Sequence, residues 1–110
     1  MIYAIVNIKR INDRDAFQQY ADQVAKIIPR FGGRYLVSEK SPEVHEGEFP
    51  YARIVIAEFP TMEDARRWYL SQEYQAIIPT RRRAFDANIF FARDFETTTG
   101  IKQDDGAVAS

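Results

Sequence analysis

The sequence contains no cysteine and only one histidine. Without cysteine there is no disulfide framework, no thiolate nucleophile and no thiolate metal ligand. One histidine offers too few nitrogen ligands for a typical zinc site, so we expect no metal and no other cofactor. The absence of cysteine also fits a reducing compartment, and we expect the protein to be cytoplasmic.

The sequence also lacks an excess of one charge and any long hydrophobic run. It carries 15 Lys and Arg residues against 16 Asp and Glu residues, so its net charge of −1 creates no field that would attract nucleic acid or an anionic membrane. The apolar run that starts at Ile2 is interrupted at Asn7 and Lys9, too early for a signal core or a membrane span. We therefore expect neither nucleic acid nor membrane as a partner.

The second half of the chain resembles the first, with an offset that grows from 48 to 50 residues. Two copies of a strand–helix–strand unit would accumulate such a drift, because loops tolerate insertions better than elements do. The matched segments are Tyr3-Ala4 and Tyr51-Ala52, Asp15-Ala16 and Asp64-Ala65, Tyr20 and Tyr69, and Ile27-Ile28-Pro29 and Ile77-Ile78-Pro79.

Hydrophobic periodicity predicts the element order βαββαβ in one domain over residues 1–95. This order is typical of a ferredoxin-like α+β fold, a four-stranded antiparallel sheet with the helices on one face. The expected strands are Ile2–Ile8, Arg34–Glu39, Tyr51–Phe59 and about Ala87–Arg93. Residues 96–110 are polar and we expect them to form a tail outside the core.

Cap and stop residues delimit the expected helices. Asn12 or Asp13 should cap the first helix, and Gly32-Gly33 should stop it with at least one glycine at positive φ. Thr61 should cap the second helix, and Ser71 should start a further short piece that Pro79 ends.

Neither face of the expected sheet is polar, although the helices can cover only one. If the β-branched residues Ile54 and Ile56 lie under the helices, the other face is open and apolar. That arrangement predicts a homodimer packed sheet against sheet. The open face would then carry Tyr3, Ile5, Val55, Phe59 and one of Phe90 or Phe91.

The chain resembles the family known as domain of unknown function (DUF) 1330, a branch of the dimeric α/β barrels. The resemblance covers about Met1 to Phe95 and implies a ferredoxin-like protomer and a sheet-to-sheet dimer, but no established reaction. It rests on Tyr20, Gly32-Gly33, Glu46-Gly47 with Pro50, Phe59-Pro60, and above all on Trp68-Tyr69, Ser71, Glu73-Tyr74-Gln75 and Arg81. Arg82-Arg83, Pro79 and the long tail depart from the family pattern.

A comparison with relatives in this superfamily indicates whether haem could be a cofactor. Some that degrade haem use an asparagine on the first strand with a tryptophan and a histidine on the second helix, and this chain has Asn7 and Trp68. The region from Thr61 to Phe85 contains no histidine, so that haem ligand is missing.

Two groups of residues could act on a ligand. His45 lies among Glu43, Glu46 and Glu48, where it is either a general base held by a carboxylate or simply an exposed loop residue. We expect Asn7 and Arg53 on the open sheet face, where Arg53 pairs with a protein acid or holds a ligand oxygen.

Tyr74 and Arg81 form a third candidate pair. They are seven residues apart, two helical turns if the helix continues past Pro79, and could line one edge of a cavity. Alternatively, Tyr74 packs under the helix and Arg81 caps backbone carbonyls.

Two classes of function remain open. The first is a dimeric small-molecule enzyme or binder with a pocket between sheet and helices. In it, Arg53 and Arg81 hold an anionic or carbonyl oxygen, and Tyr74 or His45 moves a proton without a cofactor. The second is a non-enzymatic interaction module whose dimer is its whole biochemical role.

Overall fold

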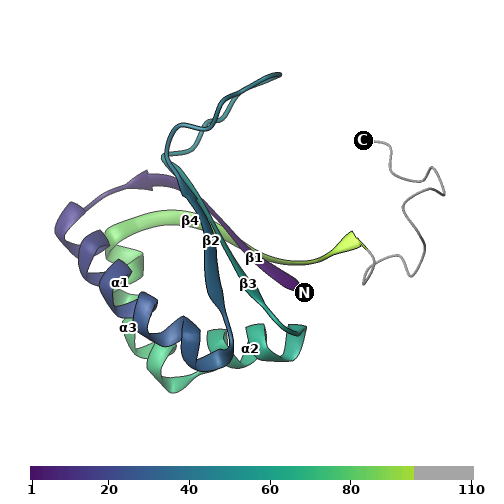
Figure 1. Ribbon diagram of the computed structural model, residues 1–110. Helices are drawn as coiled ribbons and strands as arrows, with labels where there is room; N and C mark the ends of the chain where they lie inside the picture. The colour runs from purple at the N-terminus through teal and green to yellow at the C-terminus, as the bar shows by residue number, and fades with distance from the viewer. Residues whose placement is uncertain (96–110) are drawn as a thin grey trace.

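A computed structural model describes residues 1–95 and shows the ferredoxin-like α+β fold that the sequence predicts. The four strands form one antiparallel sheet in the order β2-β3-β1-β4 (Figure 1). They are β1 (Ile2–Ile11), β2 (Arg34–Glu39), β3 (Arg53–Phe59) and β4 (Phe85–Arg93). The expected tail, residues 96–110, lies outside the described residues.

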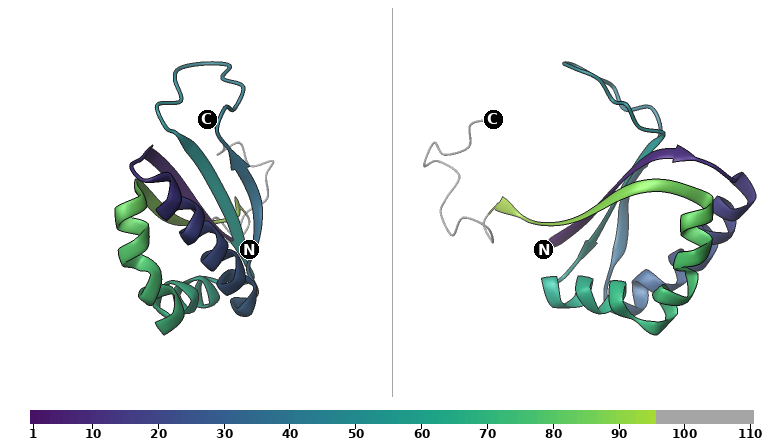
Figure 2. Two further views of the ribbon diagram at one scale, coloured as in Figure 1. Left: turned by 90° about the vertical axis from the view of Figure 1, so that its left-hand side faces the viewer. Right: turned by 180° about the vertical axis from the view of Figure 1, so that it is seen from behind.

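All helices lie on one side of this sheet, as the two views of Figure 2 show. They are α1 (Arg14–Ile27), a following 3-10 turn η1 (Ile28–Phe31), α2 (Met62–Leu70) and α3 (Gln72–Ala84). The capping predictions are confirmed, because Asp13, Thr61 and Ser71 each accept a hydrogen bond from the backbone N–H three residues later. Among residues 1–95, no helix is both long and apolar enough to cross a membrane.

The prediction that Pro79 ends the last helix is wrong, since α3 continues to Ala84. An interior proline removes one helix hydrogen bond and crowds the carbonyl four residues earlier, and here Pro79 lies on the exposed side of the helix. Ile77, Ile78 and Ala84 are buried on either side of it, so packing holds both halves of α3 against the core. Tyr74 and Arg81 therefore remain on one continuous helix.

The register of the sheet decides which residues face the helices. Ala4 pairs with Ala57 and Ile8 pairs with Arg53, and cross-strand partners share a face. Because Ala4, Ala57 and Ile8 are buried under the helices, Arg53 lies on that side too.

The expected assignment of the faces of β3 is therefore wrong. Val55 and Phe59 lie under the helices with Arg53, and Ile54 and Ile56 lie on the open face. Alternation could not decide this, because both faces of β3 are apolar. Phe59 is fully buried and stacks on Trp68 at 5.4 Å between ring centroids, a contact that the smaller Ile54 and Ile56 side chains do not offer.

Two of the matched segments are buried alike in both halves of the chain, whereas Tyr3-Ala4 lie within β1 and Tyr51-Ala52 precede β3. Ala16 and Ala65 are both buried, as are Ile27-Ile28 and Ile77-Ile78. These positions anchor α1, α2 and α3 to the core.

β2 is the most weakly held strand of the sheet. All six of its residues are exposed, it pairs only with β3, and its register shifts between Tyr35 and Val37. Such a bulge at an edge strand leaves one residue, here Leu36, without a cross-strand partner.

The chain reverses from η1 into β2 at two glycines with different constraints. Gly32 has a φ of 80°, which confirms the predicted positive φ, and it donates to the carbonyl of Pro29. Gly33 has no positive φ, but a Cβ there would lie 2.5 Å from Cε1 of Phe59 and 2.7 Å from Cγ2 of Ile28.

Both glycines should therefore resist substitution for different reasons. We expect Gly32→Ala to lower the free energy of unfolding by about 1 kcal/mol through backbone strain. Gly33→Ala should lower it by about 1–3 kcal/mol through overpacking, and Phe59→Leu in the same chain should recover part of that loss.

Urea unfolding of the single and double variants measures these free energies. Gly47→Ala is the matched control for Gly32, because Gly47 has a φ of 79° and a Cβ added there would meet no atom within 4 Å. Equal losses at Gly33 with and without Phe59→Leu would contradict the steric explanation.

Candidate functional site

A cavity of about 470 Å³ lies between the helix side of the sheet and α1. Its walls are mostly apolar, with Val6 and Val55 from the sheet, Phe17 and Val24 from α1, and Trp68 from α2. Small-molecule sites in proteins typically have this size and this apolar character, with a few polar groups that fix orientation. Here the polar side chains of the lining are Gln18, Tyr20, Tyr35, Ser38 and Arg53.

Arg53 is the cationic side chain of the lining. Its Nη1 donates to Oγ of Ser38 at 3.0 Å, and its Nε is buried without a hydrogen-bond partner. The expected alternative of a protein acid is not found among residues 1–95, because Glu58 on the opposite face pairs instead with Nε of Arg34 at 2.6 Å. An unsatisfied buried donor in an apolar cavity favours an acceptor supplied by a ligand.

Tyr20, Tyr74 and Arg81 form a hydrogen-bonded chain behind the cavity wall. The hydroxyls of Tyr20 and Tyr74 are 2.8 Å apart, and Nη1 of Arg81 donates to the Tyr74 oxygen at 2.9 Å. Arg81 also lies over the Tyr74 ring, 5.9 Å from its centroid. Sequence spacing had placed Tyr74 and Arg81 together, and the unbroken α3 does bring them into contact.

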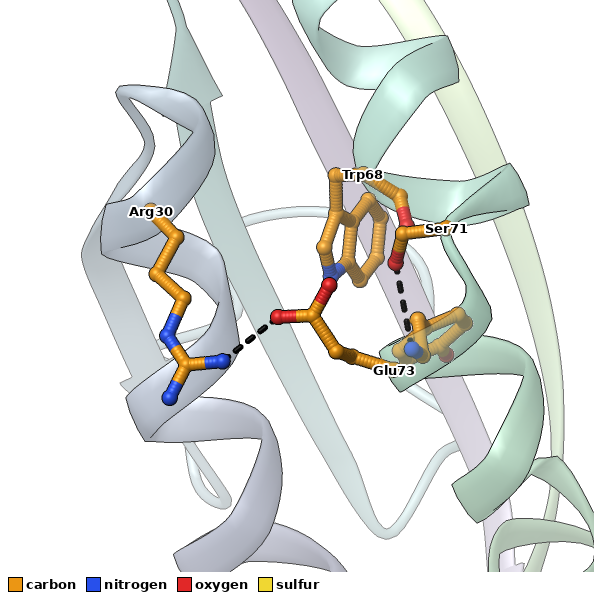
Figure 3. Close-up of polar contacts among 5 residues, drawn as sticks. Arg30, Trp68, Ser71 and Glu73 are labelled. Atoms are coloured by element: carbon orange, nitrogen blue, oxygen red, sulfur yellow. Dashed lines mark hydrogen bonds and ion pairs between the residues drawn. The ribbon is translucent and has the colours of Figure 1, made fainter.

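The start of α3 fixes where Tyr74 lies. Ser71 Oγ accepts from the backbone N–H of Tyr74 at 3.1 Å, and Arg30 forms an ion pair with Glu73 at 2.5 Å (Figure 3). The ion pair joins η1 to α3 beside Trp68, which is buried. Tyr74 is itself fully buried, so its hydroxyl can reach only protein groups.

Burial is the main cause that raises the pKa of Tyr20 well above its ordinary value, and the neighbouring Tyr74 raises it further. The Tyr20 hydroxyl therefore stays protonated through neutral and moderately alkaline pH. In this state it donates a hydrogen bond and does not act as a base.

The structure does not bring the other two candidates to the cavity. His45 lies in the loop between β2 and β3, where its Nε2 is 2.8 Å from a carboxylate oxygen of Glu43 and its side chain is 82% exposed. Asn7 lies on the open face, opposite Asn88 of β4. The expected grouping of Asn7 with Arg53 is wrong, because Arg53 lies on the helix side.

Sequence reasoning did not select Tyr20, Ser38 or Tyr35 as site residues. Tyr20 belongs to the apolar stripe of the first helix, where a tyrosine adds a polar hydroxyl to an otherwise hydrophobic set. That hydroxyl was a signal, because a buried one needs a partner. Ser38 and Tyr35 could not be recognised without knowing which face of β2 lies toward α1.

Several solved structures share this fold. A protein of unknown function from Rhodopseudomonas palustris aligns with a TM-score of 0.70 and 15% identity over 86% of this chain and 82% of that one. An EthD family protein from Bacillus halodurans aligns with a TM-score of 0.64 and 14% identity over 86% of this chain and 99% of that one. SnoaB, a cofactor-independent oxygenase from Streptomyces nogalater, gives 0.61 and 13% identity over 84% and 92%.

These likenesses define the class of the fold, a ferredoxin-like α+β arrangement with the helices on one face of the sheet. Within this class, the chain belongs to the family described as domain of unknown function (DUF1330), whose model matches residues 1–95. No curated protein matches the chain.

The raised pKa of Tyr20 predicts how stability changes in alkali. The unfolded tyrosine loses its proton near pH 10, while the folded one still holds it, so the contribution of Tyr20 to the free energy of unfolding is constant below about pH 10 and falls above it. One such group contributes a slope of up to about 1.4 kcal/mol per pH unit.

Tyr20→Phe should make this alkaline decline shallower, as measured by urea unfolding at a series of pH values together with tyrosinate absorbance. Tyr51→Phe, in the loop before β3, is the control. Identical pH profiles for wild type and Tyr20→Phe would contradict the assignment.

Proposed function

We propose that this protein binds a small molecule with an apolar body and an anionic or carbonyl oxygen, in the cavity between the sheet and α1. The observation that carries this proposal is the buried, unpartnered Nε of Arg53 in a cavity with mostly apolar walls. A planar guanidinium matches a carboxylate or a similar oxygen pair better than any other common side chain does.

The polar and apolar parts of the cavity divide recognition between them. The valine and aromatic walls take the body of the ligand through the hydrophobic effect. Arg53 takes the oxygen, with Ser38 holding Nη1 and leaving Nε free. Ligand binding would thus satisfy a donor that the protein alone leaves unsatisfied.

Tyr74 and Arg81 enter this proposal through Tyr20, because Tyr74 is fully buried and does not line the cavity. The proposal gives no role to His45 or Asn7, which lie elsewhere. SnoaB is a cofactor-independent oxygenase, but at 13% identity its likeness extends to the fold alone. The proposal therefore stops at binding and assigns no reaction.

Replacing Arg53 distinguishes between two roles of this residue, that of a ligand anchor and that of a purely structural residue. We expect Arg53→Met to leave the apo protein as stable as wild type or up to about 1 kcal/mol more stable, because a buried unsatisfied donor disappears. The same change should abolish the thermal shift that aromatic and aliphatic carboxylates or ketones produce in wild type.

Thermal denaturation of both proteins against a panel of such compounds makes the test. Arg82→Met is the matched control, since Arg82 is an exposed arginine on α3. A compound that shifts wild type and Arg53→Met equally would overturn the role of Arg53. If no compound of the panel shifts wild type, the alternative of a non-enzymatic interaction dimer is favoured.

We also propose that two copies pack through the open face of the sheet. This face has no helix over it, and Phe90 on the edge strand β4 is 50% exposed. Apolar patches of this kind usually mark interfaces. The face carries Tyr3, Ile5, Ile54, Ile56, Val37 and Phe90, with Asn7 and Asn88 at one end.

Charge placed in this face should separate the copies. Ile56→Asp and Phe90→Asp should each shift the mass in solution from twice 12.8 kDa toward 12.8 kDa, because an unpaired carboxylate would be buried in the interface. Light scattering at micromolar concentration measures the mass.

Val55→Asp provides the contrast, because Val55 lines the cavity on the other side of the sheet. We expect it to lower stability more than it alters association. A wild-type monomer, or variants that remain dimers, would contradict the proposed interface.

A further inference from the structure

The hydrogen atoms of the Tyr20–Tyr74–Arg81 chain can be assigned by elimination. Arg81 is only a donor, so the Tyr74 oxygen accepts from it. Tyr74 is fully buried and its own proton needs an acceptor. Within residues 1–95, the Tyr20 oxygen at 2.8 Å is the acceptor in hydrogen-bond distance of that hydroxyl.

By the same reasoning, the Tyr20 proton is left without an assigned acceptor. Its oxygen is already an acceptor, and no second partner for the hydroxyl occurs in the described part of the chain. Tyr20 lines the cavity. Its O–H is therefore the one hydroxyl of this hydrogen-bonded chain that belongs to a cavity-lining residue, at the end of a chain that begins at a guanidinium.

From this geometry we infer that Tyr20 donates a hydrogen bond to a carbonyl or oxyanion oxygen of the ligand, with Tyr74 and Arg81 as positioning residues. The inference rests on the proposed function, since it concerns the same cavity. The inference adds to the proposed function a specificity-determining residue, Tyr20, and a requirement that the ligand carry an acceptor oxygen.

The direction of the chain sets this requirement. Arg81 polarises the Tyr74 hydroxyl, and Tyr74 in turn polarises that of Tyr20, so successive hydrogen bonds strengthen the last donor. A hydroxyl oriented in this way offers a proton and not a lone pair. The site should therefore select a ligand with an acceptor oxygen over one of the same shape that lacks it.

Two bicyclic compounds of similar shape test this selection. 1-Tetralone carries a carbonyl oxygen and tetralin does not. We expect Tyr20→Phe to weaken 1-tetralone binding about fivefold to tenfold, the equivalent of one neutral hydrogen bond, and to leave tetralin binding unchanged. Calorimetric titration measures both affinities.

The infrared stretching frequency of the bound ketone reports the hydrogen bond directly. It should lie lower in wild type than in Tyr20→Phe, because a hydrogen bond weakens the carbonyl bond. Tyr74→Phe should cancel part of this lowering although Tyr74 does not touch the cavity, an effect that a merely structural role would not produce. Tyr51→Phe, which removes a hydroxyl from the loop before β3 and not from the cavity lining, should change nothing.

The outcomes separate this inference from the proposed function. If 1-tetralone and tetralin both bind and Tyr20→Phe alters neither the affinity nor the frequency, the inference fails and the cavity remains a ligand site. If neither compound binds to wild type, both fail. Thermal midpoints of the variants show whether a loss of binding comes from unfolding.

Discussion

The hydrogen bond between Tyr20 and Tyr74 joins α1 to α3 in the middle of the helix layer, where the neighbouring contacts are apolar, while ion pairs and backbone hydrogen bonds join the ends of this layer. Hydrophobic packing is not directional and would allow either helix to rotate or slide. A hydroxyl pair at 2.8 Å, fixed further by Arg81, permits one arrangement. The distance between α1 and the sheet, and hence the cavity, depends on this arrangement.

Much of the fold could be predicted because its determinants are local. Asp13 and Thr61 cap helices through atoms three residues away, and Gly32 turns the chain by its own φ. β2 was predicted with its observed bounds for the same reason, since glycines precede it and a proline-containing loop follows it. The element order then limits the sheet to few arrangements.

The incorrect predictions concern features that depend on contacts between residues far apart in the sequence. The side of the sheet on which Arg53 lies depends on whether Phe59 or Ile56 packs against Trp68, and both faces of β3 are hydrophobic enough to be buried. The continuation of α3 past Pro79 depends on buried Ile78 and Ala84. For the candidate site, helical spacing joined Tyr74 to Arg81, whereas Tyr20 became a site residue only once α1 lay against α3.

β2 gives the cavity a wall of low local stability. A central strand must break two ladders to detach, but β2 is bonded to β3 alone and is interrupted by a bulge at Leu36. Tyr35 and Ser38 of this strand line the cavity, and all of its side chains already meet solvent. The free energy needed to open the cavity is therefore that of peeling one edge strand, well below that of global unfolding. Opening of the cavity to solvent need not await any movement of the helices.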